Sequence, residues 1–182
     1  MHQEHINNLV NILGNFKDLK RKGWLNRQVT TPESDAEHSF SLAITALLLA
    51  TPELDLLKCL KLALFHDLPE IYAGDFTPLD NITHEQKLEK EQNAAQQIAQ
   101  ELNWPELLDL FAEYDNKSSK ESIFINALDK LDNVITARYY DNNKRSPTPL
   151  LPEFSNYAKR CLTALDNGEL EKIKNIFYHL VY

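Results

Sequence analysis

The stretch "TPELDLLKCLKLALFHD", residues 51–67, decides the fold. Its leucines recur every three or four residues, which predicts a helix with one face in a core. Pro69 cannot continue a helix without the loss of a hydrogen bond, so we expect the helix to end near His66 or Asp67. A histidine and an aspartate therefore stand side by side at the end of an apolar helix, where polar side chains can converge on a site.

The rest of the chain also has a helical pattern. Further helices are expected over residues 4–22, 34–50, 84–102, 105–115 and 120–141, with a break at Gly23, and one or two closing helices follow, with a break at Gly168. Expected N-caps are Ser34 with Glu37, Thr51 with Pro52, Thr83, and Ser118 with Glu121. No stretch alternates as a strand does, so the sequence predicts an all-α fold.

The helix over residues 34–50 is expected to lie at the centre of the molecule. Ser34 and Glu37 have the spacing of a capping box, which accounts for Glu37 without a functional role. The residues that follow, to Ala50, are apolar on most faces of the helix. Helices of that kind are buried in globular proteins.

Length and charge limit the possible functions. With 182 residues the chain is expected to form a single domain, residues 1–182. The net charge of −8 argues against nucleic acid as a partner, because such proteins need a basic surface. With only four glycines the chain has no Gly-rich phosphate loop.

The same sequence features predict a cytoplasmic protein that does not bind membranes. Cys59 and Cys161 lie far apart in no motif, which fits a reducing compartment. The N-terminus is too polar for a signal peptide. The longest apolar run, residues 42–50, is much shorter than the roughly 18 residues of a membrane span.

One short stretch, "FKDLKRKGWLNR" at residues 16–27, is locally basic. Its cations are Lys17, Lys20, Arg21, Lys22 and Arg27. Two readings stay open from the residues alone: a solvated helix face, or a rim that binds small anions.

Histidines and carboxylates occur on three separate apolar helices. His38 begins one, His66 and Asp67 end another, and Asp129 and Asp132 lie within a third. An unpaired buried charge is costly, so such residues must pair, become neutral or bind a metal. A metal ion would satisfy the whole set, although each residue alone is more simply read as a hydrogen-bonded core or surface residue.

At these residues the chain resembles a known family. His38, the pair His66-Asp67, and Asp129 match the H…HD…D signature of the HD-domain phosphohydrolases. "GWLNRQVTTPESDAEHS", "LFHDLPEIYAGDFTP" and "ALDKLDN" are similar to segments of the HD-domain 5'-nucleotidases that act on deoxyribonucleoside monophosphates. The resemblance runs from about residue 16 to about residue 142 and implies an HD-domain helical bundle, with the C-terminal helices added to it.

The resemblance implies that His38, His66, Asp67 and Asp129 hold one divalent metal ion. Two imidazoles and two carboxylates suit Mn²⁺, Co²⁺, Fe²⁺, Ni²⁺ or Zn²⁺ better than Mg²⁺. The choice of Asp129 follows from the resemblance, whereas a helical wheel over residues 124–139 places the apolar centre nearer Asp132.

Two further carboxylates follow the His-Asp pair. By the resemblance, Glu70 and Asp75 lie by the open metal positions, where a carboxylate can orient the attacking water or protonate the leaving 5' oxygen. The alternative for Glu70 is a capping role in a short helix that Pro69 begins.

The substrate contacts implied by the resemblance are less complete. Trp24 matches a family tryptophan near the substrate, and Thr77 supplies a hydroxyl. The close bacterial enzymes have a phosphate-binding arginine directly before that tryptophan, where this chain has Gly23. Arg27, with Lys20 or Arg21 as alternatives, is expected to replace it.

The resemblance implies a metal-dependent phosphomonoesterase for nucleoside 5'-monophosphates, and for deoxyribonucleotides in particular. One alternative is an HD phosphohydrolase for another small phosphate ester or a nucleoside triphosphate. An alternative of another class is a non-catalytic, metal-stabilised helical module that binds a nucleotide or a protein. A homodimer is possible, and the C-terminal "IKNIFYHLVY" could form its interface or simply cover the core.

Overall fold

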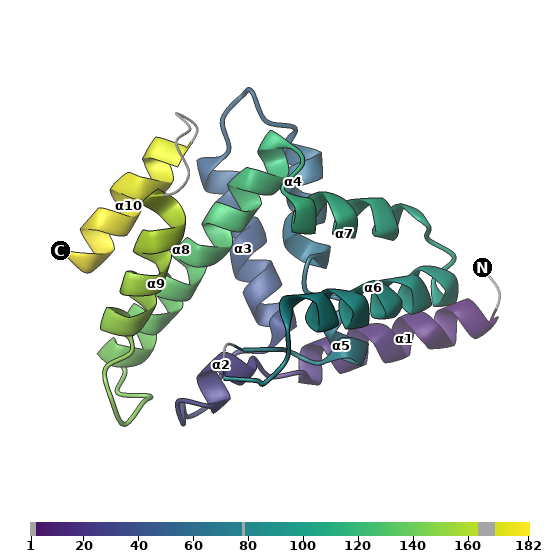
Figure 1. The fold of residues 1–182 in the computed structure, drawn as a ribbon, viewed down its shortest axis with the longest axis horizontal. Helices are drawn as coiled ribbons and strands as arrows, with labels where there is room; N and C mark the ends of the chain where they lie inside the picture. Colours follow the sequence, from purple (N-terminus) through teal and green to yellow (C-terminus); the bar gives the residue numbers. More distant parts are fainter. Residues whose placement is uncertain (1–2, 78, 164–169) are drawn as a thin grey trace.

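All regular elements in the described part of the chain are helices, as predicted (Figure 1). The computed structural model describes residues 3–77, 79–163 and 170–182. The helices are α1 (Gln3–Asp18), α2 (Lys22–Leu25), α3 (Asp35–Leu49), α4 (Leu56–Phe65), α5 (Glu70–Ala73), α6 (His84–Glu101), α7 (Glu106–Asn116), α8 (Lys120–Asn142), α9 (Leu151–Thr163) and α10 (Glu171–Val181). Among the described helices, none is long and apolar enough to cross a membrane.

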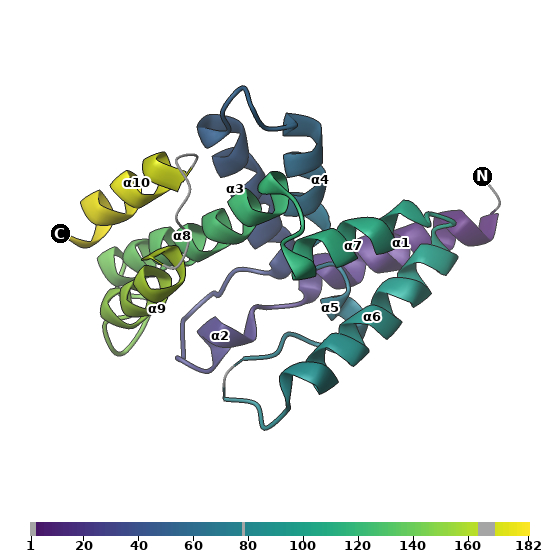
Figure 2. The same ribbon diagram turned by 45° about the horizontal axis from the view of Figure 1, so that its top comes forward.

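The long helix α8 is the centre of the fold. It packs against α3, α4, α7, α9 and α10, and its residues Phe124, Leu128 and Leu131 are buried in the main core. Figure 2 shows α9 and α10 on one side of the molecule and α1, α6 and α7 on the other. The predicted metal ligands His38, His66 and Asp129 lie where α3, the end of α4 and the middle of α8 meet.

The predicted helix ends are partly confirmed. Helix α3 has the capping box of Ser34 and Glu37, and α4 ends at Phe65 with His66 as its C-cap. The predicted N-cap Thr51 is wrong, because Asp55 caps α4 by accepting a hydrogen bond from the Lys58 N–H.

Two other caps were also predicted. Thr83 caps α6, in a capping box with Gln86. The cap predicted at Ser118 lies one residue later, where Ser119 pairs with Ser122 in a capping box. The break predicted at Gly168 lies outside the described residues.

The first helix ends at Asp18, four residues before the predicted end. The backbone of residues 19–21 instead runs antiparallel to residues 33–34, through a bridge between Lys20 and Ser34 and an Arg21 N–H bond to the Glu33 carbonyl of 3.1 Å. Gly23 lies inside the short helix α2. This pairing draws Arg21 out of a solvent-facing helix and toward the interior.

Helix α3 is central on one face only. Leu42, Ala43 and Ala46 are buried, but Phe40 and Leu48 are 65% and 75% exposed on the other side. At the C-terminus, α10 places Ile173 and Phe177 in the core, so this segment does cover the core.

Candidate metal centre and active site

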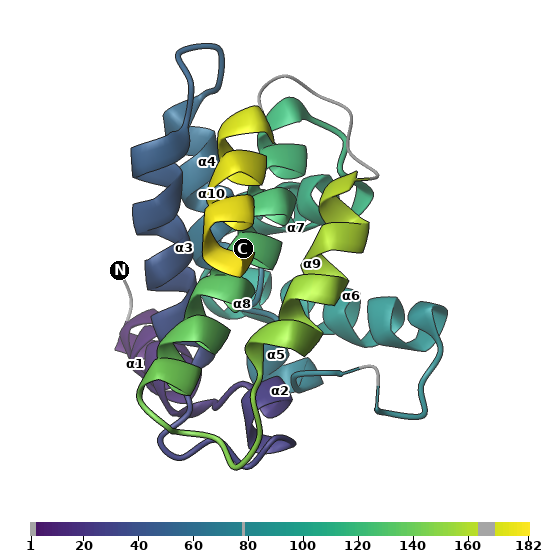
Figure 3. The same cartoon turned by 90° about the vertical axis from the view of Figure 1, so that its left-hand side faces the viewer.

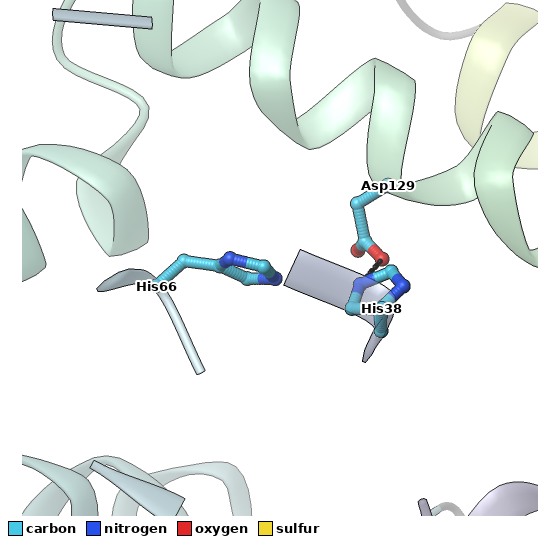
Figure 4. A group of neighbouring side chains, drawn as sticks. All are labelled: His38, His66 and Asp129. Atoms are coloured by element: carbon cyan, nitrogen blue, oxygen red, sulfur yellow. Dashed lines mark ion pairs between the residues drawn. The ribbon is translucent and has the colours of Figure 1, made fainter. Parts of the chain in front are cut away.

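Three helices bring two histidines and an aspartate together (Figure 4). His38 lies in the first turn of α3, His66 caps the end of α4, and Asp129 lies in the middle of α8. One ligand atom from each lies within 4.8 Å of the other two, and all three residues are buried. This group can hold a metal ion.

Each imidazole is oriented by a bond at Nδ1. His66 Nδ1 lies 3.0 Å from the Ala63 carbonyl, and His38 Nδ1 lies 2.8 Å from Asp132 Oδ2. Both partners accept, so each ring carries a hydrogen on Nδ1, and Nε2 is the nitrogen that can bind a metal when it carries no proton.

The two Nε2 atoms supply the test of whether a metal fits. Both are buried, and neither makes a hydrogen bond of normal geometry within the described residues. Buried polar atoms without a partner are costly. Two such nitrogens beside carboxylates are a donor set that suits a divalent transition metal.

Asp67 lies at the edge of this group of three. Its Oδ2 is 3.1 Å from His66 Nε2 and 3.8 Å from His38 Nε2. The same oxygen accepts a 2.7 Å hydrogen bond from Arg21, whose guanidinium also lies 3.7 Å from Asp35. Asp67 therefore faces both imidazoles and is held by one cation.

Asp129 and Asp132 both turn inward, on opposite sides of the His38 ring. Asp129 Oδ1 lies 3.3 Å from His38 Nε2, and its Oδ2 lies 2.6 Å from Lys130 Nζ. Asp132 is completely buried and accepts bonds from His38 Nδ1 and, at 2.6 Å, from Ser41 Oγ. Asp132 is the more buried of the two aspartates, as the helical wheel over residues 124–139 predicted. Asp129 is the one that faces the Nε2 atom of His38.

The electrostatics keep the facing carboxylates ionised. Burial alone would raise the pKa of Asp129, but Lys130 and His38 outweigh it and hold this pKa well below the usual range. The pKa of Asp67 is likewise lowered, because His66 and Arg21 outweigh its burial. For His38, burial and Arg21 disfavour the charged ring, yet the neighbouring carboxylates of Asp129 and Asp132 raise its pKa to about 10.

Glu70 has the opposite electrostatic behaviour. It is the first residue of α5, is buried, and has an Oε2 atom without a hydrogen-bond partner in the described structure. Burial, followed by the charges of Asp67 and Asp75, raises its pKa well above the ordinary value. One oxygen of each of Asp35, Asp67 and Glu70 lies within 4.8 Å of the other two.

Two cavities meet at this centre. The first has a volume of about 380 Å³ and is partly aromatic; its lining includes Trp24, Phe76, Phe154 and Tyr157. The second, of about 550 Å³, is more polar and includes Glu70, Asp80, Lys87, Lys117 and Tyr114. Residues that line both are Arg21, Asp75, Phe76, Thr77, Asp129, Lys130 and Tyr157.

Asp75 lies at this junction and is anchored by the backbone. Its Oδ2 accepts a 2.6 Å hydrogen bond from the Lys22 N–H. This bond ties the loop after α5 to the start of α2. Lys22 also forms an ion pair with Asp80.

The three residues predicted to contact substrate all line the first cavity. Trp24 is only 1% exposed; it packs against Tyr140 and Phe154, and its Nε1 donates to Glu33 at 2.8 Å. Most of its ring therefore belongs to the core, and only its edge is available to a ligand.

Arg27 and Thr77 have internal partners at the wall of this cavity. Arg27 forms an ion pair with Glu153 and donates to the Gly23 carbonyl at 2.6 Å. Thr77 Oγ1 donates to Asp80 at 3.0 Å. Arg27 lines the first cavity and does not line the second.

Sequence reasoning missed Lys130 and the wall formed by α9. Lys130 follows Asp129 directly, and this adjacency was the only available signal. Phe154 and Tyr157 lie beyond the stretch that resembles the family, and no local pattern showed that they would face the site.

Comparisons with known proteins show which family the chain belongs to. The chain matches the family model described as HD domain over residues 13–172. It is 35% identical to the 5'-deoxynucleotidase HDDC2 of Homo sapiens over 141 residues, which are 76% of this chain and 69% of that protein. The Dictyostelium discoideum protein of the same name is 37% identical over 141 residues, 71% of this chain and 74% of that protein.

A solved structure has the same fold over nearly the whole chain. The structure of a Pyrococcus horikoshii protein has a TM-score of 0.77 and 29% identity, and covers 97% of this chain and 98% of its own. The family model, the relatives and the solved structure thus agree on the family and the fold of this chain. The chain belongs to the HD domain family.

Proposed function

We propose that this protein is a metal-dependent phosphomonoesterase that hydrolyses nucleoside 5'-monophosphates, deoxyribonucleotides above all. One observation carries the proposal: two buried imidazoles with free Nε2 atoms face two ionised carboxylates where an aromatic and a charged cavity meet. The names of the relatives, which are 5'-deoxynucleotidases, support the substrate class.

The proposed metal ligands are His38, His66, Asp67 and Asp129. The expected ion is Mn²⁺, Co²⁺, Fe²⁺, Ni²⁺ or Zn²⁺, because imidazole nitrogen is a ligand that these ions accept readily. When bound, such an ion supplies an acidified water molecule and polarises a phosphate oxygen. Side chains of the protein orient the attacking water and protonate the leaving 5' oxygen.

Glu70 and Asp75 are the proposed proton-handling residues. Burial and the charges of Asp67 and Asp75 raise the pKa of Glu70, which favours its protonated form, so Glu70 is the proposed donor of a proton to the leaving 5' oxygen. Asp75, anchored to the Lys22 N–H at the junction of the cavities, orients the attacking water. These roles separate the two carboxylates from the metal ligands.

Arg21 and Lys130 are the proposed phosphate-binding cations. Each pairs with one proposed metal ligand, Arg21 with Asp67 at 2.7 Å and Lys130 with Asp129 at 2.6 Å, and both line the two cavities. A phosphate monoester dianion beside the centre would lie within reach of both. Arg21 is proposed to replace the family arginine whose position Gly23 occupies in this chain, because Arg27 is already paired with Glu153.

The nucleoside is proposed to occupy the first cavity. Phe154, Tyr157 and the edge of Trp24 offer apolar surface for a base, and Thr77 offers a hydroxyl near the sugar. The charged second cavity is the proposed route for water and released phosphate.

The proposed partners are the nucleotide and a second copy of the chain, without nucleic acid. The net charge of −8 disfavours contact with a polyanion. A cytoplasmic location is supported by the free thiols of Cys59 and Cys161.

The test is phosphate release from a panel of nucleotides with each metal in turn. The metal-free protein is loaded with Mn²⁺, Co²⁺, Zn²⁺ or Mg²⁺ and given dAMP, AMP, dATP or a simple phosphate ester. We expect monophosphates to be cleaved with a transition metal present. Hydrolysis of only triphosphates or simple esters would contradict the proposed substrate class.

Two variants accompany this panel. Glu70→Gln is expected to retain the metal and lose about 10²–10⁴-fold in kcat, the usual contribution of a proton-transferring side chain. Asp67→Asn is expected to lose the metal itself. Full activity of Glu70→Gln would show that Glu70 is structural.

A further inference from the structure

One tyrosine hydroxyl at this centre is not used by the proposed mechanism. Tyr114 lies in the last turn of α7, a helix that packs against α4, α6 and α8 (Figure 3). Its side chain lines the second cavity, together with Asp67, Glu70 and Asp129. Tyr114 therefore shares this cavity with two of the proposed metal ligands and with the proposed general acid.

The aromatic ring of Tyr114 is held in place from several sides. It lies against the imidazole of His66, with ring centroids 4.8 Å apart and ring planes inclined by 48°, and it packs against the main core. The backbone is also fixed, because Asn126 Nδ2 on α8 donates a 3.0 Å hydrogen bond to the Tyr114 carbonyl. The ring thus has a defined position beside one proposed metal ligand.

The hydroxyl at the end of this ring is without a partner in the described part of the chain. The contacts of Tyr114 are made by its ring and its backbone. Asp67 lines the same cavity but accepts a hydrogen bond from Arg21. Asp129 accepts one from Lys130. Buried tyrosine hydroxyls usually find a partner, and a phenylalanine would fill the same space, so packing does not explain this polar atom.

The charges that act on Tyr114 indicate that its hydroxyl lies near the centre. Burial, followed by the negative charges of Asp129 and Asp67, raises the pKa of Tyr114 well above its ordinary value. The positive charge of Arg21 acts in the opposite direction. These three residues surround the place where the substrate phosphate is proposed to bind. A tyrosine hydroxyl carries a proton that it can donate to such a group.

A phosphate at this centre would have hydrogen-bond donors from three parts of the fold. Arg21 directly precedes α2, Lys130 lies on α8 and Tyr114 lies on α7, and all three line the second cavity. The two cations are each paired with a proposed metal ligand, so part of their charge is already balanced. The hydroxyl of Tyr114 is the uncharged donor of the set. Its hydrogen bond to an anionic oxygen would be of the stronger, charge-assisted kind.

We propose that the Tyr114 hydroxyl donates a hydrogen bond to a non-bridging oxygen of the substrate phosphate, which makes Tyr114 a further catalytic residue. This inference rests on the proposed phosphomonoesterase function, because it requires a phosphate at the centre. The contact forms when the phosphate binds, and it persists in the transition state, in which charge is spread over the same oxygens. Tyr114 keeps its proton throughout, so no bond to it is made or broken.

The first experiment measures the binding of inorganic phosphate to the Mn²⁺-loaded protein by calorimetry, so it does not depend on turnover. Tyr114→Phe is expected to bind orthophosphate about tenfold more weakly than the wild type, the size of one hydrogen bond to an anion. Its metal content should stay unchanged, because the ring that packs against His66 remains. An unchanged Kd for orthophosphate would overturn the proposal.

The second experiment measures the hydrolysis of dAMP over a range of pH. Tyr114→Phe should lose about 10–100-fold in kcat/KM, the range for one hydrogen bond to a charged group. The shape of the pH profile should stay the same, because Tyr114 transfers no proton. A changed shape would show that Tyr114 acts through a titrating group such as Glu70, and this result would overturn the direct contact with phosphate.

Two other tyrosines serve as matched controls. The hydroxyl of Tyr72 donates to Glu101 at 2.7 Å, and neither residue lines one of the two cavities. Tyr72→Phe should therefore match the wild type in both experiments. Tyr157 lines both cavities and is the rival donor. A loss of phosphate affinity in Tyr157→Phe together with none in Tyr114→Phe would overturn the proposal.

The two readouts distinguish a failure of this inference from a failure of the proposed function. If the wild type hydrolyses no nucleotide, but binds orthophosphate more tightly than Tyr114→Phe does, the hydroxyl is a phosphate donor and the proposed substrate class is wrong. If the wild type hydrolyses dAMP, and Tyr114→Phe equals it in orthophosphate Kd and in kcat/KM, the proposed function stands and the role of Tyr114 is overturned.

Discussion

Asp132 should control metal affinity although it does not face the centre. Its carboxylate accepts the Nδ1–H of His38 at 2.8 Å and the hydroxyl of Ser41 at 2.6 Å. Asp132→Asn keeps the shape but offers one acceptor and one NH₂ group for these two donors. If the NH₂ faces the ring, the ring proton must move to Nε2, which removes the lone pair that binds the metal.

The expected loss is 10–100-fold in Mn²⁺ affinity, the usual effect of changing a residue that orients a metal-binding histidine. That range equals about 1.4–2.7 kcal/mol. It matches the roughly 1.5–3 kcal/mol of a hydrogen bond to a charged group. The expected loss of metal affinity and the usual energy of such a hydrogen bond thus agree in size.

The loss should grow as the pH rises. In the metal-free protein, Asp132 helps to raise the pKa of His38 to about 10, so a proton competes with the metal at neutral pH. Asp132→Asn weakens this competition as well as the orientation of the ring. At pH 7 the weaker proton competition raises the metal affinity while the loss of ring orientation lowers it. Near pH 10 the proton no longer competes, so only the loss of orientation affects the metal affinity.

The assay is competition with a metal-binding dye at several pH values, and the readout is the Kd for Mn²⁺. Ser41→Ala is the matched control, because it removes one bond to Asp132 and leaves the bond to His38. A Kd for Asp132→Asn within threefold of the wild type at pH 9 would refute the role of Asp132.

Three further outcomes are expected. Chelation should lower the melting temperature, and Mn²⁺ should restore it, since a ligand at a hundredfold excess over its Kd adds about 2.7 kcal/mol to the free energy of unfolding. A melting temperature that changes with neither treatment would contradict a metal site. Lys130→Met should keep the metal and raise the inhibition constant of orthophosphate about tenfold, whereas Lys90→Met on α6 should not; equal inhibition of both variants would exclude Lys130 from phosphate binding. Burial and Asp67 raise the pKa of Asp35 to about 7 from an unfolded value of 3.8. The metal-free wild type should therefore lose stability relative to Asp35→Asn as the pH rises from about 4 to 7, with no further loss above pH 7. Denaturant unfolding at each pH measures this difference in stability, and a difference that does not change with pH would refute the prediction.

Local patterns predicted the elements that carry the proposed metal ligands. The apolar period and Pro69 determined the end of α4, and hence the placement of His66 and Asp67. The capping box at Ser34 fixed the start of α3, four residues before His38. Both signals depend on neighbouring residues only, which is why the sequence alone was enough.

Contacts between distant segments were out of reach of the sequence. Arg21 turns inward only because residues 19–21 pair with residues 33–34, whereas the helical pattern continued to residue 22. Phe154 and Tyr157 reach the first cavity through the packing of α9 on α8. The exposed side of α3 was also unexpected, because an all-apolar helix does not reveal which face its own chain covers.

Two carboxylates three residues apart are held in opposite states, and this contrast is the strongest link between the fold and the proposed chemistry. Asp67 faces two imidazoles and Arg21, which outweigh its burial and lower its pKa. Glu70 has no such partner at Oε2, and burial with the charge of Asp67 raises its pKa. The environment therefore favours the ionised form of Asp67, as a ligand requires, and the protonated form of Glu70, as a general acid requires. Environments that separate the pKa values of paired groups in this way are typical of acid–base assignments in enzymes. A purely structural metal site would need the first carboxylate only, and the buried, unpaired Glu70 would then destabilise the fold without any return in function.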